Sequence, residues 1–279
     1  MADQSSLTDV LRFYRDLGFT DVRAPDLTPV AVPAPAAQVQ TSRPQASRPQ
    51  ATRSQAASPK PAVSDEPKPE WNYRPSADLA GDAGSRPEPN VILEKIQQDM
   101  GECTRCVLHE GRSKIVFGSG PADAKVVFVG EGPGADEDAQ GFPFVGRAGQ
   151  LLTQMINNTA TGEGIPIQRD DVYICNVVKC RPPGNRAPEP DEMGTCGQFL
   201  ERQLDAIRPR AICVLGGTAA KYLLDTREGI TKIRGAWKEW HGIPVMPTFH
   251  PSFLLRAYNK EGKRQAWEDL KKVLHYAYD

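Results

Sequence analysis

The sequence carries almost no net charge, has no long apolar run and shows no leader pattern at its start. Its formal net charge is -1 over 279 residues, so contact with nucleic acid would need a local basic patch rather than bulk charge. No apolar run approaches the roughly 20 residues that span a bilayer. The first ten residues, MADQSSLTDV, lack a basic segment followed by an apolar one, so secretion is not expected. We therefore expect a cytoplasmic protein without a membrane segment.

Six cysteines are present, and the expected location decides how they are interpreted. The cytosol keeps thiols reduced, so these residues indicate metal ligation or core packing rather than disulfides. The closely spaced run of Cys that is typical of bacterial ferredoxins is absent, so an electron carrier is not indicated.

The N-terminal third divides into a predicted helical segment, residues 1–20, and a predicted linker, residues 21–88. Within the first segment apolar side chains recur at helical spacing, and Gly18 can end the helix. From residue 27 onward Pro, Ala, Ser and Gln dominate, so the linker cannot bury enough apolar surface to offset its ordering entropy and is expected to be disordered. The helix is interpreted either as a frayed appendage or as a binding element for a protein partner, with the linker as its tether.

Beyond residue 89, four short apolar runs have strand-like composition, and helical patterns lie between or after them. The predicted strands are Lys125–Val129, Val172–Val178, Ala211–Leu215 and Pro244–Phe249. The predicted helices are Leu151–Asn158, Asp191–Ile207, Thr218–Leu224 and Gln265–Tyr276. Alternating strands and helices indicate βαβ units, and strands that are apolar throughout indicate a sheet covered on both faces. We predict an α/β fold, a three-layer α/β/α arrangement around a central, mostly parallel four-stranded sheet.

Polar or small residues follow each predicted strand. The sequence GEGPG (130–134) follows the first strand, Asn176 lies near the end of the second, Gly-Gly-Thr (216–218) follows the third and His250 follows the fourth. Open α/β sheets bind ligands beyond the carboxyl ends of their strands, so we expect these groups to share one edge. Alone, Asn176 is more often a satisfied core amide and His250 a packed or capping residue. Their common edge favours a ligand site.

The segment Gly-x-Gly-x-x-Ala (130–135) has the spacing of a dinucleotide-binding fingerprint and follows a strand, as that motif must. Three acidic residues (136–138) come directly after it and would repel a pyrophosphate. No acidic residue stands about 20 positions later, where a ribose partner is needed. We therefore rank this interpretation low.

The candidate metal ligands are Cys103, Cys106, Cys180 and Cys196. The Cys103-x-x-Cys106 spacing is suited to grip one metal from a tight turn. Cys175 and Cys213 lie within apolar strand runs and are expected to be small core residues. Four thiolates suit tetrahedral zinc or a [4Fe-4S] cluster. The second pair is separated by 15 residues rather than forming a paired knuckle, so the spacing favours iron–sulfur only mildly.

Three long stretches resemble the family 4 uracil-DNA glycosylases, the iron–sulfur branch of the uracil-DNA glycosylase superfamily. They read GEGPGADEDAQGFPFVGRAGQLL (130–152), NVVKCRPPGNRAPEPDE (176–192) and HPSFLLR (250–256). The pair Cys103 and Cys106 matches as well. The resemblance extends from about residue 92 to the C-terminus and implies a catalytic domain over residues 89–279.

Two details refine the resemblance. Phe142 stands where the family commonly has a basic or polar residue, which indicates a different contact with DNA at that position. A related branch that bonds covalently to DNA carries a basic, His-containing insertion in the second stretch. The sequence RPPGNRAPEP has no such insertion, which disfavours covalent chemistry.

The resemblance implies an enzyme that flips uracil out of DNA, hydrolyses its N-glycosidic bond and leaves an abasic site for base excision repair. It implies that Phe144 stacks on the flipped base, that Asn176 reads the imide edge of uracil, and that His250 stabilises the departing uracil anion. Glu131 and Glu137 both lie in the loop that can orient the attacking water, and Glu131 is favoured for its place at the strand end. Glu137 is also a candidate for crowding the 5-methyl group of thymine.

The resemblance also implies contacts with uracil-containing DNA, a [4Fe-4S] cluster on the four candidate cysteines, and a monomer. The implied contact positions are Gly132, which also binds the substrate, and Pro133, Gly134, Ser252, Leu254 and Arg256. Leu254 is expected to fill the gap left by the flipped base, with Leu255 as its rival because only one of them can face the DNA. Basic residues near the cysteines are expected to form a DNA-facing surface: Arg105, Arg112, Lys114, Lys179, Arg181 and Arg186.

Two alternatives belong to other functional classes, a non-catalytic DNA-damage binding module and a redox protein with an iron–sulfur or zinc centre. Intact Glu131, Asn176 and His250 argue against the first. Cys180 lies four residues beyond Asn176. The metal centre is therefore interpreted as a structural element that fixes the loop after the strand carrying Asn176, without a redox step in the chemistry.

Overall fold

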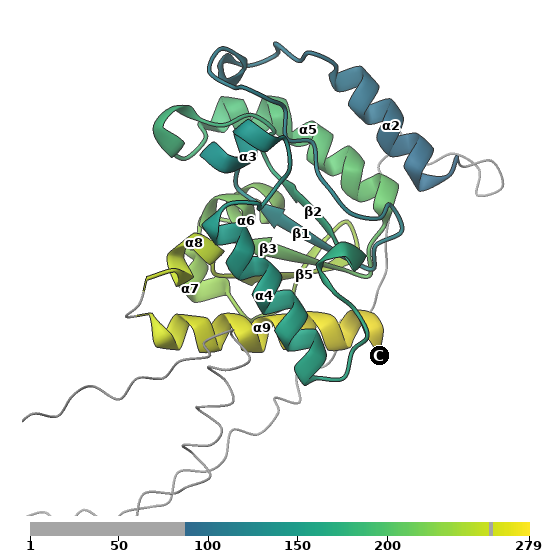
Figure 1. The fold of residues 1–279 in the computed structure, drawn as a ribbon, viewed down its shortest axis with the longest axis vertical. Coiled ribbons are helices and arrows are strands. Elements are labelled where there is room, and N and C mark those ends of the chain that lie inside the picture. Colours follow the sequence, from purple (N-terminus) through teal and green to yellow (C-terminus); the bar gives the residue numbers. More distant parts are fainter. Residues whose placement is uncertain (1–86, 257–258) are drawn as a thin grey trace, which may run out of the picture. The chain divides into compact units, whose positions relative to one another are not determined.

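The computed structural model describes residues 87–256 and 259–279, drawn as the coloured ribbon in Figure 1. The helix predicted within residues 1–20 and all but the last two positions of the predicted linker lie outside the described residues. The first described helix, α2 (Pro89–Met100), begins with a proline, which suits the first turn because no intrahelical partner exists there for its missing N–H.

A five-stranded sheet lies at the centre of the described region, with the strand order β2-β1-β3-β5-β4. The strands are β1 (Val126–Gly130), β2 (Tyr173–Asn176), β3 (Ala211–Leu215), β4 (Lys238–Trp240) and β5 (Ile243–Thr248). Neighbours among β2, β1, β3 and β5 are parallel, and β4 pairs antiparallel with β5 at one edge. The predicted mostly parallel α/β sheet is confirmed.

The sheet has five strands rather than the predicted four, because the sequence pattern does not reveal β4. Two of its three residues, Lys238 and Glu239, are exposed, so it contains no apolar run. A two-residue turn at His241 and Gly242 joins it to β5, and both residues have positive φ (48° and 83°). Positive φ at both positions is the signature of a type I′ turn, whose twist matches that of antiparallel strands.

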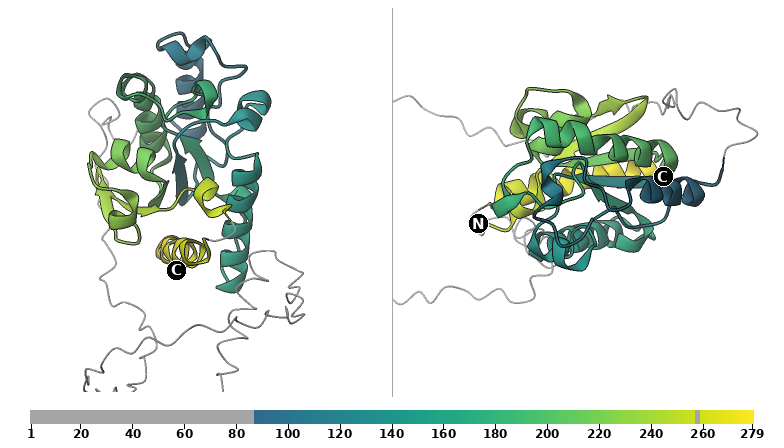
Figure 2. Two further views of the ribbon diagram at one scale, coloured as in Figure 1. Left: turned by 90° about the vertical axis from the view of Figure 1, so that its left-hand side faces the viewer. Right: turned by 90° about the horizontal axis from the view of Figure 1, so that it is seen from above.

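Helices cover both faces of the sheet. Besides α2 they are α3 (Ala135–Gln140), α4 (Arg147–Gly162), α5 (Pro190–Ile207), α6 (Gly217–Leu224), α7 (Ile230–Ile233), α8 (Pro251–Leu254) and α9 (Lys260–Tyr278), with 3₁₀ turns η2 (Val107–His109), η3 (Arg169–Asp171) and η4 (Pro183–Asn185). Helices α2, α5 and α6 pack on one face, and α4, α8 and α9 on the other (Figures 1 and 2). This is the predicted three-layer arrangement.

Alternate side chains of each central strand enter opposite cores, which explains why these strands are apolar throughout. In β1, Val127 and Val129 join the core beneath α2 and α5, whereas Val126 and Phe128 join the core beneath α4 and α9. All four side chains are fully buried. Burial stabilises the fold by roughly 1.5–3 kcal/mol for each such side chain, so the central strands form a rigid base for the loops that follow them.

The order of the strands reverses at β1. The chain runs from β1 to β2 on one side and then crosses to β3 on the other. Such a reversal opens a crevice beyond the carboxyl ends of β1 and β3, where α/β proteins bind their ligands. Within the two described ranges, no helix has both the length and the apolar composition needed to cross a membrane.

Candidate active site and cysteine centre

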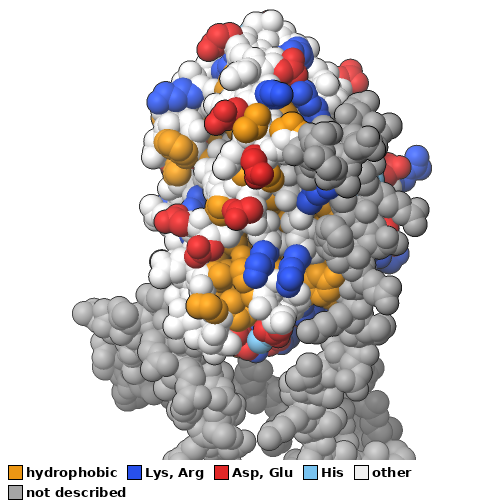
Figure 3. Space-filling model, turned by 90° about the vertical axis from the view of Figure 1, so that its right-hand side faces the viewer, with side chains coloured by type: hydrophobic (Ala, Val, Ile, Leu, Met, Phe, Trp, Pro, Cys, Tyr) orange, Lys and Arg blue, Asp and Glu red, His pale blue; other side chains and the backbone are white. Residues whose placement is uncertain are grey.

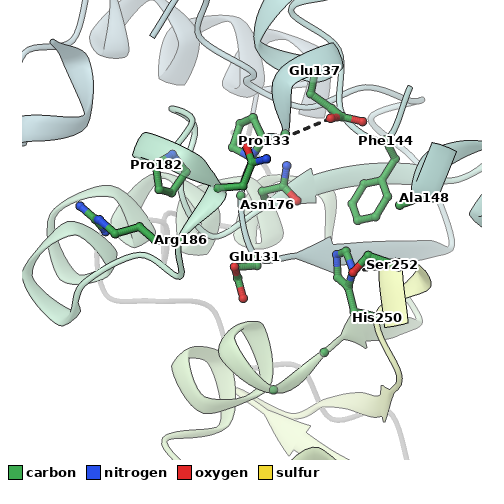
Figure 4. A pocket seen from close by; sticks show the side chains of 15 residues that line it. Glu131, Pro133, Glu137, Phe144, Ala148, Asn176, Pro182, Arg186, His250 and Ser252 are labelled. Atoms are coloured by element: carbon green, nitrogen blue, oxygen red, sulfur yellow. Dashed lines mark hydrogen bonds between the residues drawn. The ribbon is translucent and has the colours of Figure 1, made fainter. Parts of the chain in front are cut away.

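A cavity of about 330 Å³ lies at the carboxyl ends of the parallel strands and is shown in Figure 4. Nine of the predicted site residues line it: Glu131, Gly132, Pro133, Gly134, Glu137, Phe144, Asn176, His250 and Ser252. They come from the loops after β1 and β5, from the segment between β1 and α4, and from the end of β2. The groups that follow the strands therefore meet at one sheet edge, as the sequence predicts.

Asn176 ends β2 and is only 1% exposed. Its side chain lines the cavity, and neither Oδ1 nor Nδ2 has a hydrogen-bond partner among the described residues. A buried polar group without a partner costs roughly 1–3 kcal/mol, so such a group marks a place where a ligand completes the bonding. The carboxamide offers an acceptor beside a donor, which complements a planar ligand edge with the opposite pair.

Phe144 forms one wall of the cavity in a constrained backbone conformation. Its φ is 53°, which is uncommon for a residue other than glycine, and its side chain is 6% exposed. Two glycines make room for it: a Cβ on Gly130 would lie 2.6 Å from the Phe144 ring, and a Cβ on Gly149 would collide with its backbone. The ring centroid lies 5.6 Å from that of His250. The packing therefore fixes an aromatic face against the cavity.

His250 presents a neutral imidazole to the cavity. Burial lowers its pKa to about 4, although the carboxylate of Glu137 acts in the opposite direction. Its Nδ1 accepts the backbone N–H of Ser252 at 3.2 Å and lies 2.7 Å from the Ser252 hydroxyl oxygen. Because Nδ1 is an acceptor, the proton of the neutral ring is on Nε2, which provides a hydrogen-bond donor.

Glu137 is held by three backbone N–H groups. Its Oε1 accepts from Val145 at 2.9 Å and from Gly146 at 2.8 Å, and its Oε2 accepts from Gly134 at 3.1 Å. These bonds join the start of α3 to the loop before α4. The oxygens of this carboxylate are therefore used to hold the two segments together. Glu131 is half-buried and borders the cavity directly after β1 (Figure 4). Because three backbone bonds already occupy most acceptor sites of Glu137, Glu131 is the better candidate to hold a water molecule.

Six further residues, outside the predicted catalytic, substrate-binding and DNA-binding set, line the cavity: Ala148, Pro182, Asn185, Arg186, Gly216 and Gly217. The two glycines follow β3, in the segment expected at this edge. Arg186 was expected on a basic surface, and it forms a 2.6 Å ion pair with Glu192 at the start of α5. Asn185 accepts a hydrogen bond from Arg181 at 2.8 Å. Pro182, Asn185 and Arg186 lie in the stretch RPPGNR (181–186), whose match to the family is the sequence signal for them.

The prediction that Leu254 enters the DNA is wrong for this structure. Its side chain is fully buried in the core shared with α4 and α9, and a residue that wedges into a duplex must be exposed. The neighbouring Leu255 and Phe253 are exposed, at 37% and 38%. Arg256 is exposed too, with its guanidinium 5.7 Å from the centre of the Phe253 ring. The sequence HPSFLLR does not separate the two leucines, because only the direction of α8 decides which one faces the core.

The four candidate ligands line a second cavity, next to α5: Cys103, Cys106, Cys180 and Cys196. Three N–H donors reach their sulfur atoms. Arg105 lies 3.3 Å from the sulfur of Cys103, Arg112 lies 3.4 Å from the sulfur of Cys180, and the backbone nitrogen of Lys179 lies 3.2 Å from the sulfur of Cys196. Cys175 and Cys213 are instead fully buried in the two cores, as predicted. Three separate segments of the chain therefore meet at the cysteine cavity.

This set of thiols fits a bound metal group. Burial raises the pKa of Cys180 above its usual range and raises the pKa of Cys196 to about 11, so a cation is needed to hold both as thiolates. Within residues 87–256 and 259–279, no three His, Cys, Asp or Glu side chains surround one point as a single ion requires. Tetrahedral zinc holds every sulfur about 2.3 Å from one ion, whereas a [4Fe-4S] cluster takes one Cys per iron. Four gathered thiols supply the number of ligands that either group takes.

Two residues of the expected basic surface do not lie on it. Lys179 is 1% exposed, and burial lowers its pKa. The side chain of Arg112 is 10% exposed and bonds to the cysteine segments. Both are near a cysteine in the sequence. Their positive side chains bond to groups inside the protein and are not available to DNA. On the face shown in Figure 3, Lys and Arg are interspersed with Asp and Glu, so its coloured residues form no patch of one sign.

Comparisons with known proteins agree with this geometry. The family model described as the uracil DNA glycosylase superfamily matches residues 117–271. The Type-4 uracil-DNA glycosylase of Thermotoga maritima is 48% identical over 184 residues, which are 65% of this chain and 93% of that protein. The Type-4 uracil-DNA glycosylase of Sulfurisphaera tokodaii is 44% identical over 193 residues, 66% of this chain and 84% of that protein.

The chain is less similar to a relative of another type of uracil-DNA glycosylase. The Type-5 uracil-DNA glycosylase of Pyrobaculum aerophilum is 32% identical over 169 residues, 57% of this chain and 73% of that protein. The type-4 proteins are thus more similar to this chain in sequence and are covered over more of their length. With its α/β fold, its cavity at the sheet edge and its four gathered cysteines, the chain belongs to the uracil-DNA glycosylase superfamily and, within it, to the type-4 family.

Proposed function

We propose that the chain is a uracil-DNA glycosylase, a hydrolase that cuts the N-glycosidic bond between uracil and deoxyribose in DNA and leaves an abasic site for base excision repair. Residues 89–279 form its catalytic domain. The observation that carries the proposal is the buried carboxamide of Asn176, which has no hydrogen-bond partner among the described residues and lines a cavity that also holds a neutral imidazole.

Asn176 selects the base. Its carboxamide pairs with one carbonyl and the imide N–H of uracil, whereas cytosine presents the reverse donor and acceptor pattern at that edge. A bidentate contact of this kind discriminates by roughly 1–3 kcal/mol. Phe144 provides the face on which the flipped base stacks, which offsets part of the few kcal/mol that unstacking costs.

His250 and Glu131 act on the bond that breaks. The oxygen of water attacks C1′ of the sugar, and the electron pair of the C1′–N1 bond leaves with uracil as an anion. Nε2–H of His250 donates to the uracil oxygen on which charge builds, and removal of a donor of this type typically costs ~10²–10³ in rate. The carboxylate of Glu131 orients the water, stabilises the cationic sugar and accepts the proton of the water.

The same cavity rim binds the DNA. Gly132, Pro133 and Gly134 allow the backbone to approach a phosphate closely, and Ser252 and Arg256 bind other phosphates. We assign the wedge to Leu255 in place of the buried Leu254, because an exposed apolar side chain can fill the gap that the flipped base leaves.

The four gathered cysteines would hold a [4Fe-4S] cluster. When bound, the cluster supplies thiolate–iron bonds that join the loop after α2, the loop after β2 and α5. Hydrolysis transfers no electrons to or from the protein, so the chain needs this centre for structure rather than for a redox step. This weakens the alternative of a redox protein.

The decisive experiment incubates the purified protein with a uracil-containing oligonucleotide and then treats the DNA with alkali. Strand cleavage at the uracil position supports the proposal, and matched oligonucleotides with thymine or cytosine serve as controls. A protein that binds this DNA but leaves it alkali-resistant would be a non-catalytic binding module. The protein partner of residues 1–20, the monomeric state and the cytoplasmic location stay predictions.

A further inference from the structure

Lys179 is a buried amine that the proposed reaction does not use. Its side chain is among the largest that are fully buried, at 1% exposure. The Nζ atom donates to the backbone carbonyl of Asn176 at 2.8 Å and to Oε1 of Gln203 at 2.6 Å. An amine is costly to bury even with such partners, so its place directly behind the base-reading residue calls for a specific role.

The partner Gln203 is itself fixed in the interior of the fold. It is fully buried on α5, and its Nε2 donates to the carbonyl of Phe117 at 3.0 Å and to the hydroxyl oxygen of Tyr173 at 3.1 Å. Tyr173 begins the strand that Asn176 ends. The amine of Lys179 is therefore held between α5 and the carboxyl end of β2.

The backbone of Lys179 belongs to the cysteine loop. Its N–H donates to the sulfur of Cys196 at 3.2 Å, its carbonyl accepts the N–H of Val116 at 2.8 Å, and Cys180 is the next residue. One residue thus joins the cysteine cavity, through its backbone, to the base-reading cavity, through its side chain.

We propose that Lys179 is a positioning residue for base recognition, which holds the backbone of Asn176 so that its carboxamide meets the edge of uracil, and which links that orientation to the loop carrying Cys180. The inference rests on the proposed function. The carboxamide has no partner of its own among the described residues, so its direction is set by the backbone to which Lys179 bonds.

The test replaces Lys179 by methionine, which keeps the length of the side chain and removes its donors. In the fully loaded holoenzyme, Lys179→Met should weaken the binding of free uracil about tenfold, because a misaligned Asn176 carboxamide loses part of its bidentate contact with the base. The ratio of excision from uracil to excision from cytosine should fall with it. The visible absorption per chain and the affinity for abasic-site DNA should stay those of the parent.

Two controls separate positioning from loss of stability. Leu274→Ala removes buried side-chain volume on α9, against the opposite face of the sheet, and should lower the melting temperature without changing uracil affinity. Gln203→Met leaves the bond from Lys179 to Asn176 and removes the second anchor, so it should reproduce a smaller loss of uracil affinity.

Parental uracil affinity and selectivity in Lys179→Met would overturn the inference. So would a loss of activity that only follows a loss of visible absorption, since Lys179 would then serve the cysteine loop alone. If Lys179→Met does not fold, Gln203→Met decides, and parental uracil affinity in that variant overturns the inference. A parent protein that leaves uracil-DNA uncut would instead defeat the proposed function.

Discussion

The backbone N–H of Ser252 donates to Nδ1 of His250 at 3.2 Å, and this bond determines which nitrogen of the ring carries the proton. An amide N–H can only donate, so Nδ1 must be the acceptor and Nε2 the donor. Burial meanwhile lowers the pKa of the ring to about 4 and keeps it uncharged near neutral pH. The proposed stabilisation of a uracil anion therefore depends on an aligned dipole rather than on an imidazolium.

The lowered pKa of His250 predicts a pH-dependent stability. An unfolded chain binds the proton near pH 6.5, and the folded chain binds it only near pH 4. Between these values protonation favours the unfolded state, so stability should fall as the pH is lowered, by up to about 1.4 kcal/mol per pH unit from this residue. Urea unfolding at several pH values should show a shallower fall for His250→Gln than for the parent. Equal slopes in the two proteins would contradict the lowered pKa.

Asn176→Asp should shift base preference from uracil toward cytosine. The change replaces the amide donor by an acceptor, or by a hydroxyl when protonated, so uracil should lose roughly 1–3 kcal/mol of its advantage. The measurement is the ratio of excision rates on matched oligonucleotides. Asn185→Asp is a control with the same chemical change on the rim of the same cavity. Base selectivity that survives Asn176→Asp would remove this residue from base recognition.

The two carboxylates should respond in opposite ways to the same substitution. Glu131→Gln should lower the rate of the chemical step by ~10² or more with an unchanged melting temperature, because it removes a base and leaves the fold intact. Glu137→Gln should destabilise the protein by about 0.5–2 kcal/mol, because three backbone N–H groups lose a carboxylate partner. Single-turnover kinetics and thermal melts distinguish the two, and the reverse pattern would exchange their roles.

The adjacent leucines at the end of α8, Leu254 and Leu255, should separate stability from activity. Leu254→Ala should cost about 2–5 kcal/mol of stability, because its side chain is fully buried. Leu255→Ala should leave stability unchanged and slow excision from duplex DNA more than from single strands, where no gap has to be filled. Equal activity of Leu255→Ala and the parent on duplex DNA would rule out the wedge.

Two cysteines close in sequence offer a test of the metal centre. Cys180→Ser should lower the bound iron and the visible absorption of the purified protein, because it removes one ligand. Cys175→Ser changes a fully buried core residue and should keep both signals. Metal analysis provides the measurement. If the unmutated protein contained stoichiometric zinc and no iron, the proposed cluster would be wrong and the site would be a zinc site.

The parts of the fold that the sequence predicts well are those with dense apolar patterns. Strand β3 has the predicted bounds Ala211–Leu215, because five consecutive apolar residues leave little choice of register. Strand β4 has no such pattern, and its pairing depends on the turn at His241 and Gly242. A two-residue turn with glycine at its second position was the available signal, and it was weaker than the apolar runs around it.

The candidate site shows a similar division. Asn176 and His250 could be placed at one sheet edge from strand ends alone. The burial of Lys179 could not be predicted, because a basic residue near Arg181 in a polar stretch is typical of a protein surface. The choice between Leu254 and Leu255 depends on how α8 is turned against α4 and α9, and two adjacent leucines contain no information about that rotation.

Gly130 has a consequence for laboratory evolution of this protein. A methyl group at this position would collide with Oδ1 of Asn176 and lie 2.6 Å from the ring of Phe144. A mutation there would therefore disturb both of the residues proposed to contact the base at once. Libraries that aim at a new base preference should keep glycine at 130 and vary position 176, where the donor and acceptor pattern can change one atom at a time.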